Sequence, residues 1–244
     1  MRDFFHRFLF AIAVTAVMNA LDMIYHLATG WAVHLNYVAI KITVIFLSVW
    51  MITQFIGIGK QEGVVASIFS PFMFYIYYVF AGATLNRDVF KIDEQFWFFF
   101  LHAVLMGIAY FSAWNFLYSG NKRIKNVCFV ITAGFMSIAF HALFLMVRWR
   151  IAGLDEETAA SVFTLSALLI PMIAYFVGII TGILSETFFR RKIFGVGVTS
   201  LLPAGIIFIG TNELVASFFA LLFVLLSCYI VYTFKKGLVV VHNE

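Results

Sequence analysis

Long apolar runs, separated by short polar links, recur along the whole chain. A helix needs about 20 apolar residues to cross a hydrocarbon core of about 30 Å. Eight stretches of the 244-residue chain satisfy this requirement, some of them marginally. The predicted spans are residues 8–27, 37–58, 64–84, 96–118, 127–147, 160–188, 194–210 and 214–234. The seventh is short and contains Pro203, so it is either a tilted span or a re-entrant segment.

The composition requires lipid around most of the chain. Hydrophobic residues make up 64% of the sequence and charged residues 11%, whereas a soluble domain carries roughly 25% charged residues. The runs are continuously apolar and do not alternate, which excludes a β-barrel, and open strands would leave backbone groups unpaired in lipid. We therefore predict an all-α, polytopic integral membrane helix bundle, with a single transmembrane domain over residues 1–244.

The distribution of Lys and Arg predicts that both ends of the chain are cytoplasmic. With the N-terminus inside, the inner basic residues are Arg2, Arg7, Lys60, Lys122, Arg123, Lys125, Arg190, Arg191, Lys192, Lys235 and Lys236. The outer ones are Arg87, Lys91, Arg148 and Arg150. This bias favours an even number of crossings. We expect the protein to lie in the cytoplasmic membrane of a bacterium or an archaeon. Because the basic residues lie in short links, the pI of about 9.1 does not indicate a nucleic-acid partner.

A few ionisable residues fall inside the predicted spans, all at a similar depth. They are Asp22 and His26 in the first span, Lys41 in the second, His102 in the fourth and His141 in the fifth. With a rise of 1.5 Å per residue, each lies about 6–12 Å below the outer end of its span. Ionisable residues inside a membrane mark a site or a buried pair. Because four helices place them in one layer, we expect their side chains to meet.

The leading interpretation of this layer is a site for Zn²⁺ or another divalent metal, since carboxylate and imidazole groups are suitable ligands. The predicted ligands are Asp22, His26, His102 and His141. A metal with an open position would activate water for hydrolysis of an amide or ester in a hydrophobic or lipid-like substrate. Lys41, and His34 at the outer mouth, are the predicted catalytic groups, acting in proton transfer. This interpretation describes a metal-dependent hydrolase or lipid-modifying enzyme.

Three other functions fit the same residues. His102 and His141 could bind haem b axially, as in a b-type cytochrome or a subunit of a membrane redox complex. Asp22, Lys41 and the histidines could instead form the polar pocket of a proton-coupled small-molecule transporter or channel, although no internal repeat is visible. Asp22 and Lys41 could also simply neutralise each other in a non-catalytic subunit. The expected partners are membrane lipids, and a homo-oligomer or larger membrane complex.

Two arginines end the fifth predicted span. Arg148 and Arg150 flank Trp149, and a tryptophan at this position is typical of an anchor at the membrane interface. We expect the arginines to be solvated rim charges. The alternative is that they bind a lipid phosphate above the histidine layer.

Overall fold

The structure is a computed structural model that describes residues 2–84 and 92–238, and these residues form helices without a strand. The helices are α1 (Arg2–Ala28), α2 (Leu35–Phe55), α3 (Lys60–Thr84), α4 (Ile92–Tyr118), α5 (Lys122–Ile151), α6 (Glu156–Val162), α7 (Leu165–Phe189), α8 (Lys192–Thr211) and α9 (Leu214–Leu238). The predicted outer charges Arg87 and Lys91 lie outside the described residues.

Seven helices of the described part are long and apolar enough to cross a membrane: α1, α2, α4, α5, α7, α8 and α9. The predicted multi-pass helix bundle is therefore confirmed. The third predicted span lies in α3, a helix of 25 residues, although the side chains of residues 78–84 are outside the described set. The seventh predicted span is a 20-residue helix, α8, that continues through Pro203. Its length fits a full crossing and not a re-entrant segment.

The sixth predicted span was too long at its beginning. The sequence predicts a continuous helix over residues 160–188, but the structure has a short α6, an interruption, and then α7. Thr164 is extended there, with φ −108° and ψ 167°, and its Oγ1 lies 2.7 Å from Oγ of Ser166. Hydroxyl side chains near a helix start favour this kind of local hydrogen bond over a continuous helix. The apolar character of Ala159 and Ala160 reflects burial of α6 at the outer rim.

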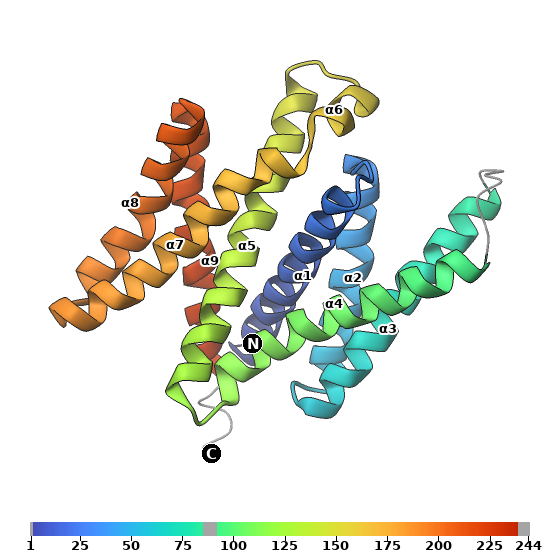
Figure 1. Ribbon diagram of the computed structural model, residues 1–244. Helices are drawn as coiled ribbons and strands as arrows, with labels where there is room; N and C mark the ends of the chain where they lie inside the picture. The colour runs from blue at the N-terminus through green and yellow to red at the C-terminus, as the bar shows by residue number, and fades with distance from the viewer. Residues whose placement is uncertain (1, 85–91, 239–244) are drawn as a thin grey trace.

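Consecutive long helices run in opposite directions, so the inner links predicted from charge lie at one end of the bundle (Figure 1). The beginning of α1 and the end of α9 lie toward that same end, in the lower half of Figure 1. The α3–α4 and α7–α8 hairpins lie on opposite sides of a central group made of α1, α2, α5 and α9. The arrangement agrees with an even number of crossings.

Helix α1 lies at the centre of the bundle and packs against α2, α4, α5 and α9. In its most apolar 18-residue window 72% of the residues are buried, against 22% for α8. Its inner end is fixed to α2, because Arg7 Nη1 donates to the carbonyl oxygens of Thr53 (2.7 Å) and Gln54 (3.3 Å). These carbonyls belong to the last turn of α2, where backbone acceptors have no intrahelical donor. Polar side chains on α1 are therefore held inside the protein.

Helices α7 and α8 approach each other closely at glycines. A Cβ added to Gly178 would clash with Pro203 Cγ, and one added to Gly182 would clash with Thr199 Oγ1. The added Cβ of Gly182 would also lie 2.9 Å from the backbone oxygen of Gly195. Small residues are typical of close helix contacts in membranes. The glycines therefore set the distance between these two helices.

Candidate functional site

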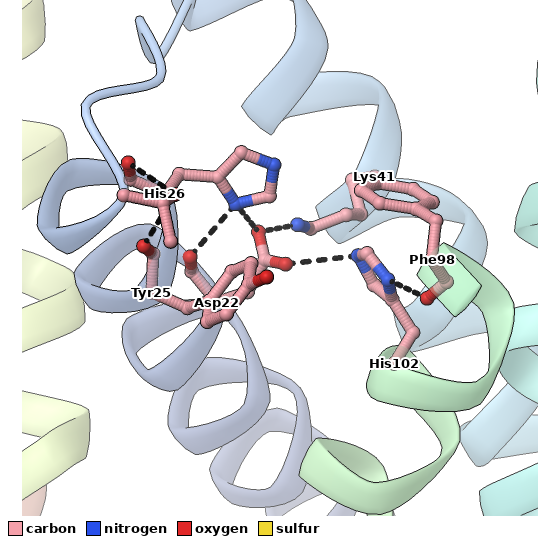
Figure 2. Close-up of polar contacts among 7 residues, drawn as sticks. Asp22, Tyr25, His26, Lys41, Phe98 and His102 are labelled. Carbon is pink, nitrogen blue, oxygen red and sulfur yellow. Dashed lines mark hydrogen bonds and ion pairs between the residues drawn. The ribbon is translucent and has the colours of Figure 1, made fainter. Parts of the chain in front are cut away.

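Asp22 on α1 is the centre of a buried polar cluster that draws side chains from α2 and α4 (Figure 2). Its Oδ2 accepts a hydrogen bond from Nζ of Lys41, and its Oδ1 lies 2.8 Å from Nε2 of His102. All three residues are buried, with relative exposures of 0–1%. One carboxylate is thus shared by two basic groups that separate helices bring to it.

The surroundings of the carboxylate are mainly aromatic. Lys41 Nζ lies 4.9 Å from the ring centre of Tyr37 and 5.9 Å from that of Phe74. The ring of Phe98 lies 4.0 Å from the ring of His102, centre to centre. Aromatic faces attract a cation but solvate it less well than water does, and a buried charge is costly unless it is paired. Asp22 therefore has to balance the charge of its basic neighbours.

His26 is the outermost member of the cluster. It lies one turn after Asp22 on α1, and its Nδ1 is 2.9 Å from the backbone oxygen of Asp22 and 3.3 Å from Oδ2. Helix α1 ends two residues later, where Gly30 adopts a φ of 78° and Trp31 N donates to the carbonyl of His26. The Trp31 ring packs edge-on against the imidazole, with centres 5.5 Å apart. His26 therefore connects the buried carboxylate to the outer end of the bundle.

The position of His102 brings a ring nitrogen close to a carboxylate oxygen of Asp22. Its Nδ1 is 2.7 Å from the carbonyl oxygen of Phe98, one turn earlier on α4, and must carry a hydrogen because a carbonyl only accepts. In a neutral ring, Nε2 would then present a lone pair to Asp22 Oδ1 at 2.8 Å. The two atoms do not meet hydrogen-bond geometry in this structure, so the contact is electrostatic. A proton on either group removes the repulsion.

The polar face of α1 continues inward from Asp22. Thr15 and Asn19 precede Asp22 by seven and three residues, a spacing that places them on the same face of a helix. Asn19 Nδ2 donates to the backbone oxygen of Thr15 at 2.9 Å. The Asn19 Oδ1 and the Thr15 Oγ1 are buried and have no hydrogen-bond partner within the described part of the chain. We did not predict these two residues from the sequence because neither is charged, although their spacing was visible there.

His141 does not join this cluster. Its Nδ1 lies 2.9 Å from Oη of Tyr175 on α7, and both residues are buried. The second predicted catalytic residue, His34, lies at the outer rim, where its Nδ1 is 3.9 Å from Glu156 Oε1. The structure thus brings together Asp22, His26, Lys41 and His102 and places His34 and His141 elsewhere.

The geometry does not support the predicted metal site. Among the described residues, no group of three or more His, Cys, Asp or Glu side chains is placed to hold a metal ion. The Lys41 ammonium group contacts Asp22 Oδ2, one of the two carboxylate oxygens that could bind a metal ion. A haem between His102 and His141 is not supported either, because these rings face Asp22 and Tyr175.

Comparisons with known proteins assign no role to these residues. The chain matches none of the protein-family models, none of the curated proteins and none of the solved structures with which it was compared.

Proposed function

We propose that the protein is a proton-coupled membrane transporter whose proton-binding centre consists of Asp22, Lys41 and His102. One observation carries the proposal: a single buried carboxylate contacts two basic side chains from two other helices. One carboxylate balances one positive charge. In a buried site, where an unbalanced charge is costly, Lys41 and His102 therefore compete to be the protonated partner.

Competition for one carboxylate links proton binding to helix packing. Protonation of His102 strengthens the attraction between α4 and α1, whereas protonation of Lys41 strengthens the attraction between α2 and α1. Loss of a proton from either base weakens the corresponding contact. A ligand moves a conformational equilibrium only through a difference in its affinity for the two states. The affinity for a proton at this centre therefore differs between a state in which α1 packs against α2 and one in which it packs against α4. Such a difference in affinity is the requirement for coupling.

Polar groups on both sides of the centre support a route for protons. His26 reaches toward the outer end of α1, and its ring nitrogen lies within 3.3 Å of the Asp22 carboxylate. On the inner side, Asn19 and Thr15 continue the polar face for about 10 Å, at 1.5 Å per residue. Their buried side-chain oxygen atoms have no hydrogen-bond partner within the described part of the chain, so they can accept hydrogen bonds from water. Polar groups of this kind inside a membrane mark ion and proton pathways.

The metal-dependent hydrolase expected from the sequence is less well supported by the geometry. A metal site would require Lys41 to leave Asp22 and His141 to leave Tyr175. In each pair the two residues lie on different helices, 19 and 34 residues apart in sequence. Proton binding requires no such rearrangement. Metal analysis of the purified protein distinguishes the two functions, since a hydrolase of this kind binds a stoichiometric divalent metal.

Proton movement can be measured in liposomes that contain the purified protein and an internal pH-sensitive dye. With a potassium diffusion potential applied, the wild type is expected to acidify the lumen faster than empty liposomes, in the presence of a panel of small solutes. Asp22→Asn, which keeps the shape but removes the titratable group, is expected to reduce the rate to that of empty liposomes. His34→Gln is the matched control, because His34 lies at the rim. Equal rates for the wild type and Asp22→Asn would overturn the proposal.

A further inference from the structure

A second feature lies away from the polar cluster, between the outer halves of α5 and α9. An apolar groove of about 490 Å³ runs there, and its walls include Phe140, Phe144, Val147, Val215, Phe219 and Phe223. Val147 and Val215 are exposed by 44% and 53%. Because both helices are candidate membrane spans, the groove opens toward lipid.

The length of the groove matches one leaflet of a bilayer. Along α5 its lining extends from Phe140 to Ile151, which is about 16 Å at 1.5 Å per residue. Half of a hydrocarbon core of about 30 Å is about 15 Å. The groove ends at the outer end of α5, where the last turn contains Arg148 and Arg150. An acyl chain of an outer-leaflet lipid therefore fits it from end to end.

The mouth of the groove carries one positive and one negative side chain. Arg148 Nη1 donates to Oε2 of Glu213, and the two side chains remain 39% and 44% exposed. The sequence predicted a solvated rim charge at Arg148, and in the structure this side chain is partly exposed and also paired. A guanidinium group has five N–H donors, and this hydrogen bond uses one of them. Arg148 can therefore still bind an anion, and Glu213 can still accept from a cation.

We propose that this groove binds one acyl chain of a phospholipid whose headgroup carries an ammonium group. Arg148 binds the lipid phosphate through charge-assisted hydrogen bonds, and Glu213 accepts a hydrogen bond from the ammonium group. The charges at the mouth match a zwitterionic headgroup, whereas an anionic lipid without an ammonium group meets repulsion from Glu213. The site is separate from the proton-binding centre, and the inference does not depend on the proposed transport function.

Native mass spectrometry of the full chain tests the site directly. The purified protein is titrated with phosphatidylethanolamine or phosphatidylglycerol of identical acyl chains. We expect one phosphatidylethanolamine per chain to be retained, and roughly tenfold weaker binding of phosphatidylglycerol, as for the loss of one charge-assisted contact. Equal binding of the two lipids, or binding of neither, would overturn the proposal.

Variants at the mouth and in the groove identify the place of binding. Arg148→Gln is expected to weaken phosphatidylethanolamine binding roughly tenfold, and Arg150→Gln, the same change two residues away, leaves it unchanged. Val215→Trp fills the groove from its exposed side, without replacing a buried residue, and is expected to abolish retention of the lipid. Retention of phosphatidylethanolamine by Val215→Trp, or equal effects of the two arginine changes, would place the lipid elsewhere and contradict the proposal.

Discussion

Asp22 Oδ1 and His102 Nε2 lie 2.8 Å apart in the interior of the bundle, although the two residues belong to helices that are separated in sequence by α2 and α3. The hydrogen on Nδ1 of His102 is held by the Phe98 carbonyl. A proton on either His102 Nε2 or the Asp22 carboxyl would therefore turn the repulsion between two lone pairs into an attraction. This relationship makes the stability of the bundle depend on the charges around Asp22.

Asp22→Asn is expected to lower the free energy of unfolding by about 3–5 kcal/mol, because it leaves the buried Lys41 without its counter-charge. The double variant Asp22→Asn/Lys41→Met is expected to recover most of this loss, since a methionine side chain packs well against the rings of Tyr37 and Phe74. Unfolding in mixed micelles measures both changes. Proton movement should stay absent in the double variant, so stability and activity separate. A double variant as unstable as the single one would contradict the ion pair.

His102→Gln is expected to keep the fold and to remove the titratable group that exchanges a proton with Asp22. Glutamine can donate a hydrogen bond to Asp22 Oδ1, so the loss in the free energy of unfolding should stay at about 1 kcal/mol. Glutamine cannot titrate, however, and the proton no longer moves between a base and the carboxylate. The measurement is the pH dependence of the infrared band of a protonated carboxyl group, with proton flux as a second readout. An unchanged pH dependence in this variant would show that His102 is not a proton partner.

The pair of His141 and Tyr175 is expected to contribute to stability only. Removing either partner leaves the other buried and without its hydrogen bond, at a cost of about 1–3 kcal/mol. In a double-mutant cycle of His141→Leu and Tyr175→Phe, the two costs should be less than additive, because the residues are in contact. Proton flux per folded protein should match the wild type in all three variants. Loss of flux on Tyr175→Phe would mean that the two polar clusters act together.

The level of the polar residues along their helices could be read from the sequence, and their direction around the helix could not. Asp22, Lys41 and His102 were expected in one layer, and the structure places them in contact. His141 was expected at the same depth but faces Tyr175 on α7. A residue's depth depends on its position along the helix, whereas its direction depends on which neighbours pack against that helix. The latter comes from contacts between distant segments, which a single sequence does not contain.

Helix boundaries show the same division between local and tertiary information. Apolar runs predicted the bundle because each span satisfies its own backbone in lipid. The interruption at Thr164 was missed because residues on both sides of it are apolar or small. Asn19 and Thr15 were missed for a different reason. Uncharged polar residues cost less in a membrane than charged ones, so their presence in a span does not by itself indicate a site. Their proposed part in a proton route depends on Asp22 being the centre of the cluster.

Asp155 is expected to make the short helix α6 sensitive to acid. Its Oδ1 accepts from the backbone N–H of Thr158 at 2.7 Å, and its Oδ2 accepts from the hydroxyl of the same residue. These hydrogen bonds hold the pKa of Asp155 below its ordinary value. A lowered pKa in the folded state stabilises α6 above the ordinary pKa of the carboxyl, and this contribution is lost as the pH falls through the lowered value. The protection factor of the Thr158 amide, which is the intrinsic exchange rate divided by the observed rate, should therefore fall in acid. In Asp155→Ala it should be low at every pH, whereas Asp155→Asn keeps a cap without the pH dependence.

Gly182→Ala is expected to destabilise the contact between α7 and α8. The new Cβ would clash with Thr199 Oγ1 and lie 2.9 Å from the backbone oxygen of Gly195, so the helices have to separate rather than only rotate a side chain. Overpacking of this kind costs typically about 1–3 kcal/mol. Gly205→Ala is the matched control on α8, because a Cβ there meets nothing within 4 Å. Its unfolding free energy should equal that of the wild type or exceed it by up to about 1 kcal/mol, since alanine favours a helix over glycine. Unfolding in mixed micelles compares the two variants. Equal stability would mean that α7 and α8 are farther apart in the membrane than in this structure.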